Sequence, residues 1–180
     1  MQSRIRIFCW LPLLGVVCLL APLQADATEP PSLRDIEIAG QVLAFQSDHT
    51  GGGMTLGVVF NPDSSASRSE AEAILGLIGR GLNVGKIFLT ARAIPQGALR
   101  DRPDVGALLV TGDVDQALLR TVLAGHHLLC LTRHLDEVAH GACTVAICSK
   151  PAVDIVINDA NATAADVHFA TAFRMMVREI

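Results

Sequence analysis

The chain has 180 residues, of which 51% are hydrophobic and 18% are charged, and its formal net charge is −4. This composition supports one domain with a buried core and excludes a disordered chain. Basic residues are not clustered, which argues against a nucleic-acid-binding surface. Aromatic residues make up only 4%, which disfavours sites built from stacked aromatic rings, such as many sugar-binding and single-strand-binding sites.

The first 27 residues have the layout of a secretory signal peptide. Arg4 and Arg6 provide a positive start, Ile7–Leu23 is almost wholly apolar, and an Ala-Asp-Ala cleavage pattern ends at Ala27. An uncleaved membrane anchor is the alternative, but two prolines interrupt a run that is already short for a membrane span. We therefore predict cleavage after Ala27, a mature domain over 28–180 and a periplasmic location.

Apolar runs alternate with helical patterns along the rest of the chain. Ser32 is placed to cap a first helix, and Ser67 with Glu70 matches a capping box that opens a second. Near-continuous apolar runs bounded by turn residues indicate buried strands. The expected helices are Leu33–Phe45, Ser67–Leu82, Asp113–Leu123, a short turn or helix over His134–Ala139, and a largely helical tail over Asp159–Val177 with a break near Asp166. The expected strands are Thr55–Phe60, Lys86–Ile94, Val105–Thr111, His127–Thr132, Cys143–Cys148 and Val153–Asn158.

This alternation of strands and helices with short loops is typical of α/β proteins. Parallel strands buried on both faces have near-continuous apolar sequences, as these do. We predict a single-domain α/β sandwich of three layers, with a mostly parallel sheet of about five or six strands and right-handed crossovers.

Ligands of open α/β sheets bind beyond the carboxyl ends of the strands. The loop that starts at Asn61 precedes a helix N-terminus, whose free N–H groups favour anions. Its alternative interpretation is a capped turn with polar surface residues, and Asp63 opposes an anion. The weak candidates for ligand binding at this edge are Asn61, Ser64, Ser65, Ser67, Thr111 and Arg133.

The sequence carries no catalytic signature. It contains no GxSxG, GxxxxGK[ST] or HExxH motif, and no spacing links a nucleophile to a base. We therefore expect a protein that is not an enzyme and that needs no cofactor.

Histidines and cysteines are concentrated in one stretch, 126–148. These side chains are ligands for zinc or copper, but CxxC and HxxxH spacings are missing. We therefore expect no metal, and keep His126, His134 and His140 as weak candidates. The alternative is a buried thiol with surface histidines around a loop.

Three cysteines follow the predicted signal peptide. On one straight strand, Cys143 and Cys148 would lie roughly 16 Å apart on opposite faces, too far to bridge. A disulfide in an oxidising compartment would therefore join Cys130 to Cys143 or Cys148, unless the strand bends between the last two. The alternative is three reduced thiols.

Large apolar residues of the tail recur at helical spacing. Phe169, Phe173, Met176 and Ile180 would share one helix face. Such a face either packs on the core or docks a partner, and exposed methionines adapt well to partners.

The order of these features resembles the YfiR-like periplasmic proteins. The matching stretches include the first helix, the strand TLGVV, the run DVGALLVTGD, the run LLCLTRHLDEVAHGACTVAI with Gly141, and VDIVIN ending at Asn158. The resemblance spans 33–180. It implies a small exported α/β domain that restrains a membrane diguanylate cyclase. The closing pattern also resembles, more weakly, one lobe of the solute-binding proteins of ABC transporters.

We therefore predict an exported regulatory or binding module of the YfiR-like type that acts by protein contact, with a redox response through its cysteines. Its expected partner is an inner-membrane signalling or transport protein, or a second copy of the chain, and not a nucleic acid. The alternative function is binding of a small molecule in connection with transport.

Overall fold

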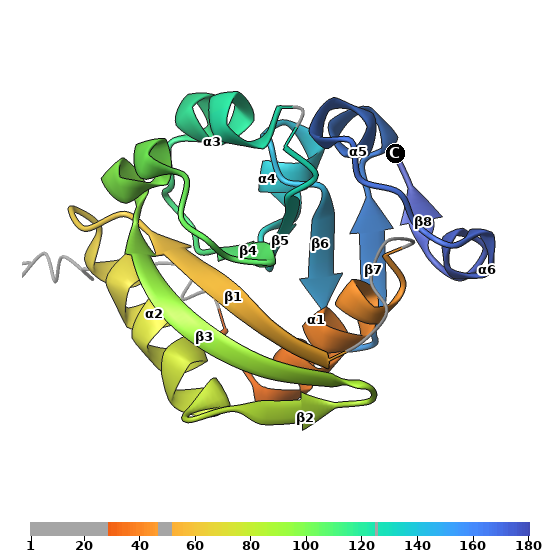
Figure 1. Ribbon diagram of the computed structural model, residues 1–180, viewed down its shortest axis with the longest axis horizontal. Helices are drawn as coiled ribbons and strands as arrows, with labels where there is room; N and C mark the ends of the chain where they lie inside the picture. Colours follow the sequence, from red (N-terminus) through yellow and green to blue (C-terminus); the bar gives the residue numbers. More distant parts are fainter. Residues whose placement is uncertain (1–28, 47–51, 125) are drawn as a thin grey trace, which may run out of the picture.

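The computed structural model describes residues 29–46, 52–124 and 126–180. The predicted signal peptide over 1–27 lies outside the described residues. Within them, eight strands form one mixed sheet in the order β2-β3-β1-β4-β5-β6-β7-β8 (Figure 1). The strands are β1 (Gly52–Phe60), β2 (Leu82–Val84), β3 (Ile87–Pro95), β4 (Ala107–Val110), β5 (Leu129–Thr132), β6 (Val145–Cys148), β7 (Asp154–Ile157) and β8 (Arg178–Glu179).

The five central strands β3, β1, β4, β5 and β6 run parallel. Strand β2 is antiparallel to β3, and β7 is antiparallel to β6, whereas β8 runs parallel to β7. The α/β class and the mostly parallel sheet are therefore confirmed. The sheet has eight strands where five or six were predicted, because a short strand at each edge has no strong apolar pattern of its own.

Helices cover both faces of the sheet (Figure 1). Helices α1 and α2 lie on one face, and α3 and α4 lie on the other. In the order of the sheet, β3 lies on one side of β1, whereas β5 lies on the opposite side of β4. Right-handed crossovers between these pairs of parallel strands therefore place α2 and α3 on opposite faces of the sheet. The helices are α1 (Leu33–Ala44), α2 (Ser65–Ile78), the 3₁₀ helix η1 (Gln96–Asp101), α3 (Gln116–Leu123), α4 (Leu135–Ala139), α5 (Asp159–Ala165) and α6 (Thr171–Arg174).

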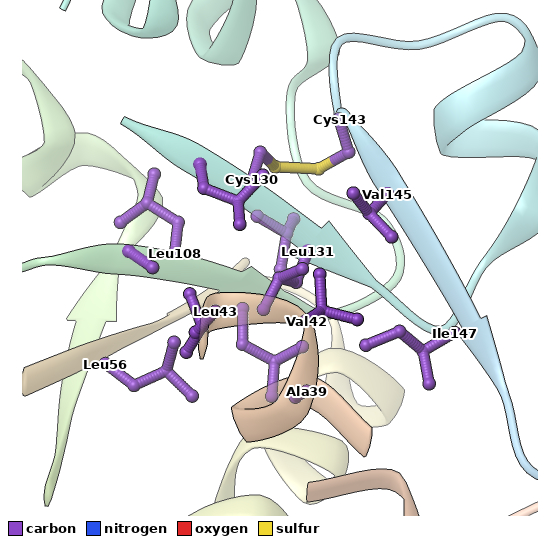
Figure 2. Close-up of a cluster of buried hydrophobic side chains, with 14 of the residues drawn as sticks. Ala39, Val42, Leu43, Leu56, Leu108, Cys130, Leu131, Cys143, Val145 and Ile147 are labelled. Atoms are coloured by element: carbon purple, nitrogen blue, oxygen red, sulfur yellow. A yellow bond between two sulfur atoms is a disulfide. The ribbon is translucent and has the colours of Figure 1, made fainter. Parts of the chain in front are cut away.

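The core between α1 and the sheet is built from aliphatic side chains. Val42 and Leu43 of α1 are fully buried, and so are Leu56 of β1 and Leu131 of β5 on the face of the sheet that α1 covers (Figure 2). Burying a side chain of this size contributes about 1.5–3 kcal/mol, which fixes α1 against the sheet. The helix also begins where predicted, because Ser32 and Asp35 cap each other reciprocally.

Helix α2 begins earlier and ends earlier than its pattern suggested. Ser64 is the N-cap, so the predicted capping box at Ser67 is wrong, and Ser67 lies buried inside the helix. The helix ends at Ile78 because Gly79 takes a positive φ of 56°. The chain then forms the hairpin of β2 and β3 around Gly85 (φ 59°), where a continuous helix to Leu82 was expected.

The tail divides into two short helices and an edge strand. Asp166 adopts the left-handed conformation (φ 55°, ψ 46°) and ends α5, at the predicted break. The expected helix beyond it is reduced to one turn, α6. Phe173 of this turn packs inward and stacks on Phe45 with ring centroids 4.8 Å apart. Phe169 is also buried, whereas Met176 and Ile180 are exposed, so the apolar residues of the tail do not share one face.

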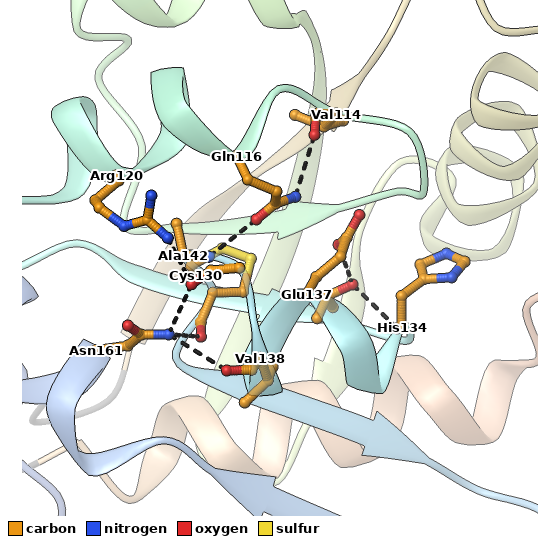
Figure 3. Close-up of a disulfide and its surroundings, with 12 residues drawn as sticks. Val114, Gln116, Arg120, Cys130, His134, Glu137, Val138, Ala142 and Asn161 are labelled. Atoms are coloured by element: carbon orange, nitrogen blue, oxygen red, sulfur yellow. Dashed lines mark hydrogen bonds between the residues drawn. A yellow bond between two sulfur atoms is a disulfide. The ribbon is translucent and has the colours of Figure 1, made fainter.

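A disulfide joins Cys130 of β5 to Cys143, which lies just before β6 (Figure 3). Both residues are fully buried, and their Cα atoms are 4.8 Å apart. Cys148, at the end of β6, is a free and exposed thiol. The predicted disulfide is therefore present, and it ties two neighbouring parallel strands together.

No helix in residues 29–46, 52–124 and 126–180 combines the length and the apolar character needed to cross a membrane.

Candidate functional site

The sheet has a topological switch point between β1 and β4. These strands are parallel neighbours, but the chain leaves β1 towards β3 on one side and leaves β4 towards β5 on the other. The loops that follow the two strands therefore diverge at the carboxyl edge of the sheet. Open α/β sheets bind their ligands at such a point.

A cleft with a volume of about 650 Å³ lies at this edge. Four segments form it: residues 29–31 before α1, which we call the leader, the first half of α2, the loop after β4, and the segment after β5 with α4. The lining residues are Glu29, Pro30, Pro31, Ala66, Ser67, Ser69, Glu70, Ala73, Gly112, Asp113, Arg133, His134, Asp136 and Glu137. We call it the switch-point cleft. Its volume is in the range of small-molecule sites.

Glu70, on α2, is the centre of the polar contacts in the cleft. Its Oε1 lies 3.1 Å from Arg133 Nη1, and its Oε2 accepts hydrogen bonds from His134 Nε2 at 2.9 Å and from the backbone N–H of Gly112 at 3.1 Å. Burial would raise the pKa of Glu70, but the hydrogen bond from His134 and the nearby positive charges hold this pKa below its ordinary value. The hydrogen bond to Glu70 in turn raises the pKa of His134. Glu70 is therefore ionised at neutral pH and joins three segments.

Arg133 extends this network to the first helix. Its Nε lies 3.4 Å from Oδ2 of Asp35, and its Nη2 donates to the backbone oxygen of Glu29 at 2.7 Å. The side chains of Arg133 and Asp35 are only 12% and 6% exposed. The guanidinium therefore holds the leader and α1 against α2, and most of its donors are occupied.

Glu137, on α4, is a half-buried carboxyl in the same cleft. Its Oε2 accepts a hydrogen bond from Thr132 Oγ1 at 2.8 Å, and the same hydroxyl oxygen accepts one from the backbone N–H of His134 at 3.1 Å (Figure 3). Burial raises the pKa of Glu137 to about 7. Glu137 therefore changes its charge close to neutral pH.

Gly112 allows the loop after β4 to approach His134. A Cβ added at Gly112 would lie 3.1 Å from Cε1 of the His134 ring. A larger residue would require the imidazole to shift by a few tenths of an ångström, so Gly112, the second glycine of the run DVGALLVTGD, has a packing role.

Of the six residues predicted from sequence to bind a ligand, Ser67 and Arg133 line the cleft. The hydroxyl of Ser67 is already used: its oxygen lies 2.7 Å from Thr111 Oγ1 and accepts the backbone N–H of Asn61 at 2.8 Å. Thr111 is fully buried and donates to the oxygen of Val59. These hydrogen bonds connect the loop after β1 to the start of the loop after β4.

The other candidates lie beside the cleft. Asn61 donates to the backbone oxygen of Asp113, Ser64 caps α2 and donates to Asp113 Oδ2, and Ser65 is exposed. Sequence reasoning missed Glu70, Asp113 and Glu137 as lining residues. A usable signal existed for Glu70, which lies one helical turn after Ser67.

The three histidines kept as weak metal candidates lie apart. His134 is bound to Glu70, His126 lines a separate cavity of about 320 Å³ beside Arg102, and His140 is exposed. In the part of the chain that the structure describes, no three His, Cys, Asp or Glu side chains are placed to hold a metal ion.

Comparison with known proteins adds a fold relationship. No protein-family model matches the chain, and no curated protein matches it. A solved structure described as a conserved domain protein from Vibrio cholerae O1 biovar El Tor is similar, with a TM-score of 0.52 and 11% sequence identity. The match covers 83% of this chain and 60% of the other, so the chain spans about three fifths of that protein. At this identity the similarity shows the fold alone.

Proposed function

We propose that this chain is an exported regulatory module of the YfiR-like type, which acts by contact with an inner-membrane signalling protein such as a diguanylate cyclase and not by catalysis. The observation that carries the proposal is an exposed apolar group at the end of the chain. Met175 is 83% exposed, Met176 67% and Ile180 47%. We call these three residues the C-terminal apolar patch. Met175 and Met176 are consecutive and Ile180 follows four residues later. Grouped exposed apolar residues mark interaction sites, and methionine adapts to varied partners.

The segment that carries the patch is held in place. Phe173, two residues before the patch, is buried, and Arg174 pairs with Asp159 at 2.9 Å and with Glu179 at 2.8 Å. Strand β8, which lies between Met176 and Ile180 in the chain, forms one edge of the sheet (Figure 1). An open strand edge offers unpaired backbone groups to a partner strand. The patch is thus presented by a fixed element, as a docking surface requires.

A periplasmic location is part of the proposal. The Cys130–Cys143 disulfide supports it, because disulfides persist in oxidising compartments outside the cytoplasm. Periplasmic extraction followed by intact-mass measurement tests it. A mass that corresponds to cleavage after Ala27, two hydrogens lighter than the reduced chain, is expected. Full-length reduced protein in the cytosolic fraction would contradict the location.

Recovery of a partner from bacterial membranes tests the contact. Wild-type protein is expected to retain one inner-membrane protein, and Met175→Glu with Met176→Glu is expected to lose it. Phe88→Glu is the matched control, because Phe88 is also an exposed apolar residue (43%) but lies on β3, near the opposite edge of the sheet. Failure to recover an inner-membrane protein, or equal recovery by the double variant, would overturn the proposal.

Small-molecule binding is a second candidate function, in line with the resemblance to one lobe of solute-binding proteins. The switch-point cleft favours it, since its position and volume suit a ligand. A thermal-shift screen over anions, amines, amino acids and metals tests it, because a ligand that binds the native state raises the unfolding temperature. The absence of any shift would remove this candidate.

A further inference from the structure

The two cationic side chains of the switch-point cleft are already neutralised by the protein itself. Arg133 lies against both Asp35 and Glu70, and its Nη2 is taken by a backbone oxygen. His134 is bonded to Glu70. Both side chains are largely buried, 12% and 23% exposed respectively. They therefore leave little positive potential for an incoming anion.

Three other carboxyl groups of the cleft have no such partner. Asp113, Asp136 and Glu137 form no ion pair with Lys, Arg or His in residues 29–46, 52–124 and 126–180. Glu137 is half-buried, and a single hydroxyl, that of Thr132, donates to it among the described side chains. A carboxylate that is partly desolvated without a directly paired counter-charge is unfavourable. The cleft therefore has an excess of negative charge that a cation would offset.

The shape of the cleft favours an organic cation over a metal ion. Its volume of about 650 Å³ far exceeds that of one ion, and part of its wall is apolar, formed by Pro30, Pro31, Ala66 and Ala73. No three His, Cys, Asp or Glu side chains in the described part of the chain converge as metal ligands would. An alkyl chain can lie on the apolar wall while a charged end group reaches the carboxylates.

We propose that the switch-point cleft binds a small aliphatic ammonium or guanidinium compound, with the charged group at Glu137 and the alkyl part on the wall of Pro31, Ala66 and Ala73. The inference rests on the second candidate function and gives it a ligand class. The helix N-terminus alone would favour an anion, so the proposed ligand has the opposite charge. The reason is that both cationic side chains of the cleft, Arg133 and His134, are already in ion pairs, whereas three of its carboxyl groups are not.

Isothermal titration calorimetry on the purified chain at pH 8 tests the proposal. The probes are 1,4-diaminobutane, its dicarboxylate counterpart succinate, and Ca²⁺. Binding of the diamine alone is expected. Glu137→Gln keeps the shape and the contact with Thr132 but removes the charge, and it is expected to weaken diamine binding about tenfold or more. Asp101→Asn, which removes an exposed carboxylate outside the cleft, is the matched control and is expected to bind as wild type does.

Thermal unfolding of both variants establishes that they fold. Tighter binding of succinate or Ca²⁺, or equal diamine binding by Glu137→Gln, would overturn the ligand class while leaving ligand binding in place. Failure of all three probes, together with no shift in the broader screen, would remove the second candidate function as well.

Discussion

Oε2 of Glu70 lies 2.9 Å from Nε2 of His134, and this contact joins the first half of α2 to the segment that follows β5. The same carboxylate also binds Arg133. Its side chain is 11% exposed, so the three charges depend on one another. Removing the anion would leave His134 partly buried without its ion-pair partner, and would leave Arg133 with Asp35 alone.

Replacement of Glu70 by Ala is therefore expected to lower the free energy of unfolding by about 3 kcal/mol, because a broken buried ion pair leaves an uncompensated charge. Urea unfolding measures this change. Glu37→Ala is the control: Glu37 pairs with Arg34 at the surface, where the two side chains are 41% and 56% exposed, and its loss is expected to cost at most about 0.5 kcal/mol. Equal effects of the two substitutions would show that the buried network does not stabilise the fold.

The pH dependence of stability follows from Glu137. Its pKa is raised from 4.5 to about 7, so between these values the native state holds a proton that the unfolded state releases. The stabilisation of the native state by the protonated form of Glu137 is fully present below pH 4.5 and is lost as pH rises through about 7. The charged groups that face it are His134, Glu70 and Asp113. Glu137→Gln is expected to remove most of the decline in stability between pH 4.5 and 7, as measured by urea unfolding at several pH values.

Two neighbouring groups shape the rest of that profile. The pKa of His134 is raised above 6.5 in the native state. Protonation of His134 therefore stabilises the native state fully at pH values below 6.5, and this stabilisation is lost as pH rises through the higher pKa of the native state. Glu70 has a lowered pKa, so its contribution is present above 4.5 and is lost on acidification. If the profile of Glu137→Gln matched that of wild type from pH 4.5 to 7, Glu137 would not be the group responsible.

Loss of the disulfide is expected to destabilise the fold by about 2–4 kcal/mol, because Cys130 and Cys143 close a loop that is otherwise free in the unfolded chain. Chemical unfolding with and without reductant measures this effect. Cys148→Ser removes the exposed free thiol and is the control. Its stability and its response to reductant should equal those of wild type, and a loss of the response in this variant would contradict the pairing.

Ser67→Ala is expected to cost about 1–3 kcal/mol, because it leaves the backbone N–H of Asn61 without its acceptor and removes the partner of Thr111 in a buried setting. Ser65→Ala changes an exposed serine at the start of the same helix and should alter stability by less than about 0.5 kcal/mol. The thermal unfolding temperatures of the two variants show whether the buried hydrogen bonds of Ser67 stabilise the fold more than an exposed serine of the same helix does. Equal unfolding temperatures would contradict a stabilising role for these hydrogen bonds.

Sequence patterns located the elements that bury a continuous apolar run. Strand β1 and helix α1 fall close to their expected bounds, since their burial is determined locally by consecutive or periodic apolar residues. The hairpin of β2 and the edge strand β8 were missed because they depend on neighbours distant in sequence. Val84 pairs with Ile87 only after Gly79 has ended α2, and β8 pairs with β7 only because Phe173 anchors the tail.

The candidate site was located more accurately than its chemistry. The carboxyl edge of the sheet follows from strand order, and Arg133, one of the six residues predicted at that edge, lines the cleft. Glu137 could not be assigned in advance, because its significance depends on its partial burial, which arises from the packing of α4 against β5 and β6. Gly141 is explained only by structure: a Cβ there would meet the Cα of Glu137 at 2.8 Å, so the glycine lets α4 end and turn back.

Site-specific photo-crosslinking in living cells tests the central claim most directly. A photoreactive residue at position 176, within the C-terminal apolar patch, is expected to form a crosslink to one inner-membrane signalling protein, whereas the same group at position 88 is not. A crosslink only to a second copy of the chain, or none from either position, would contradict the proposed mode of action.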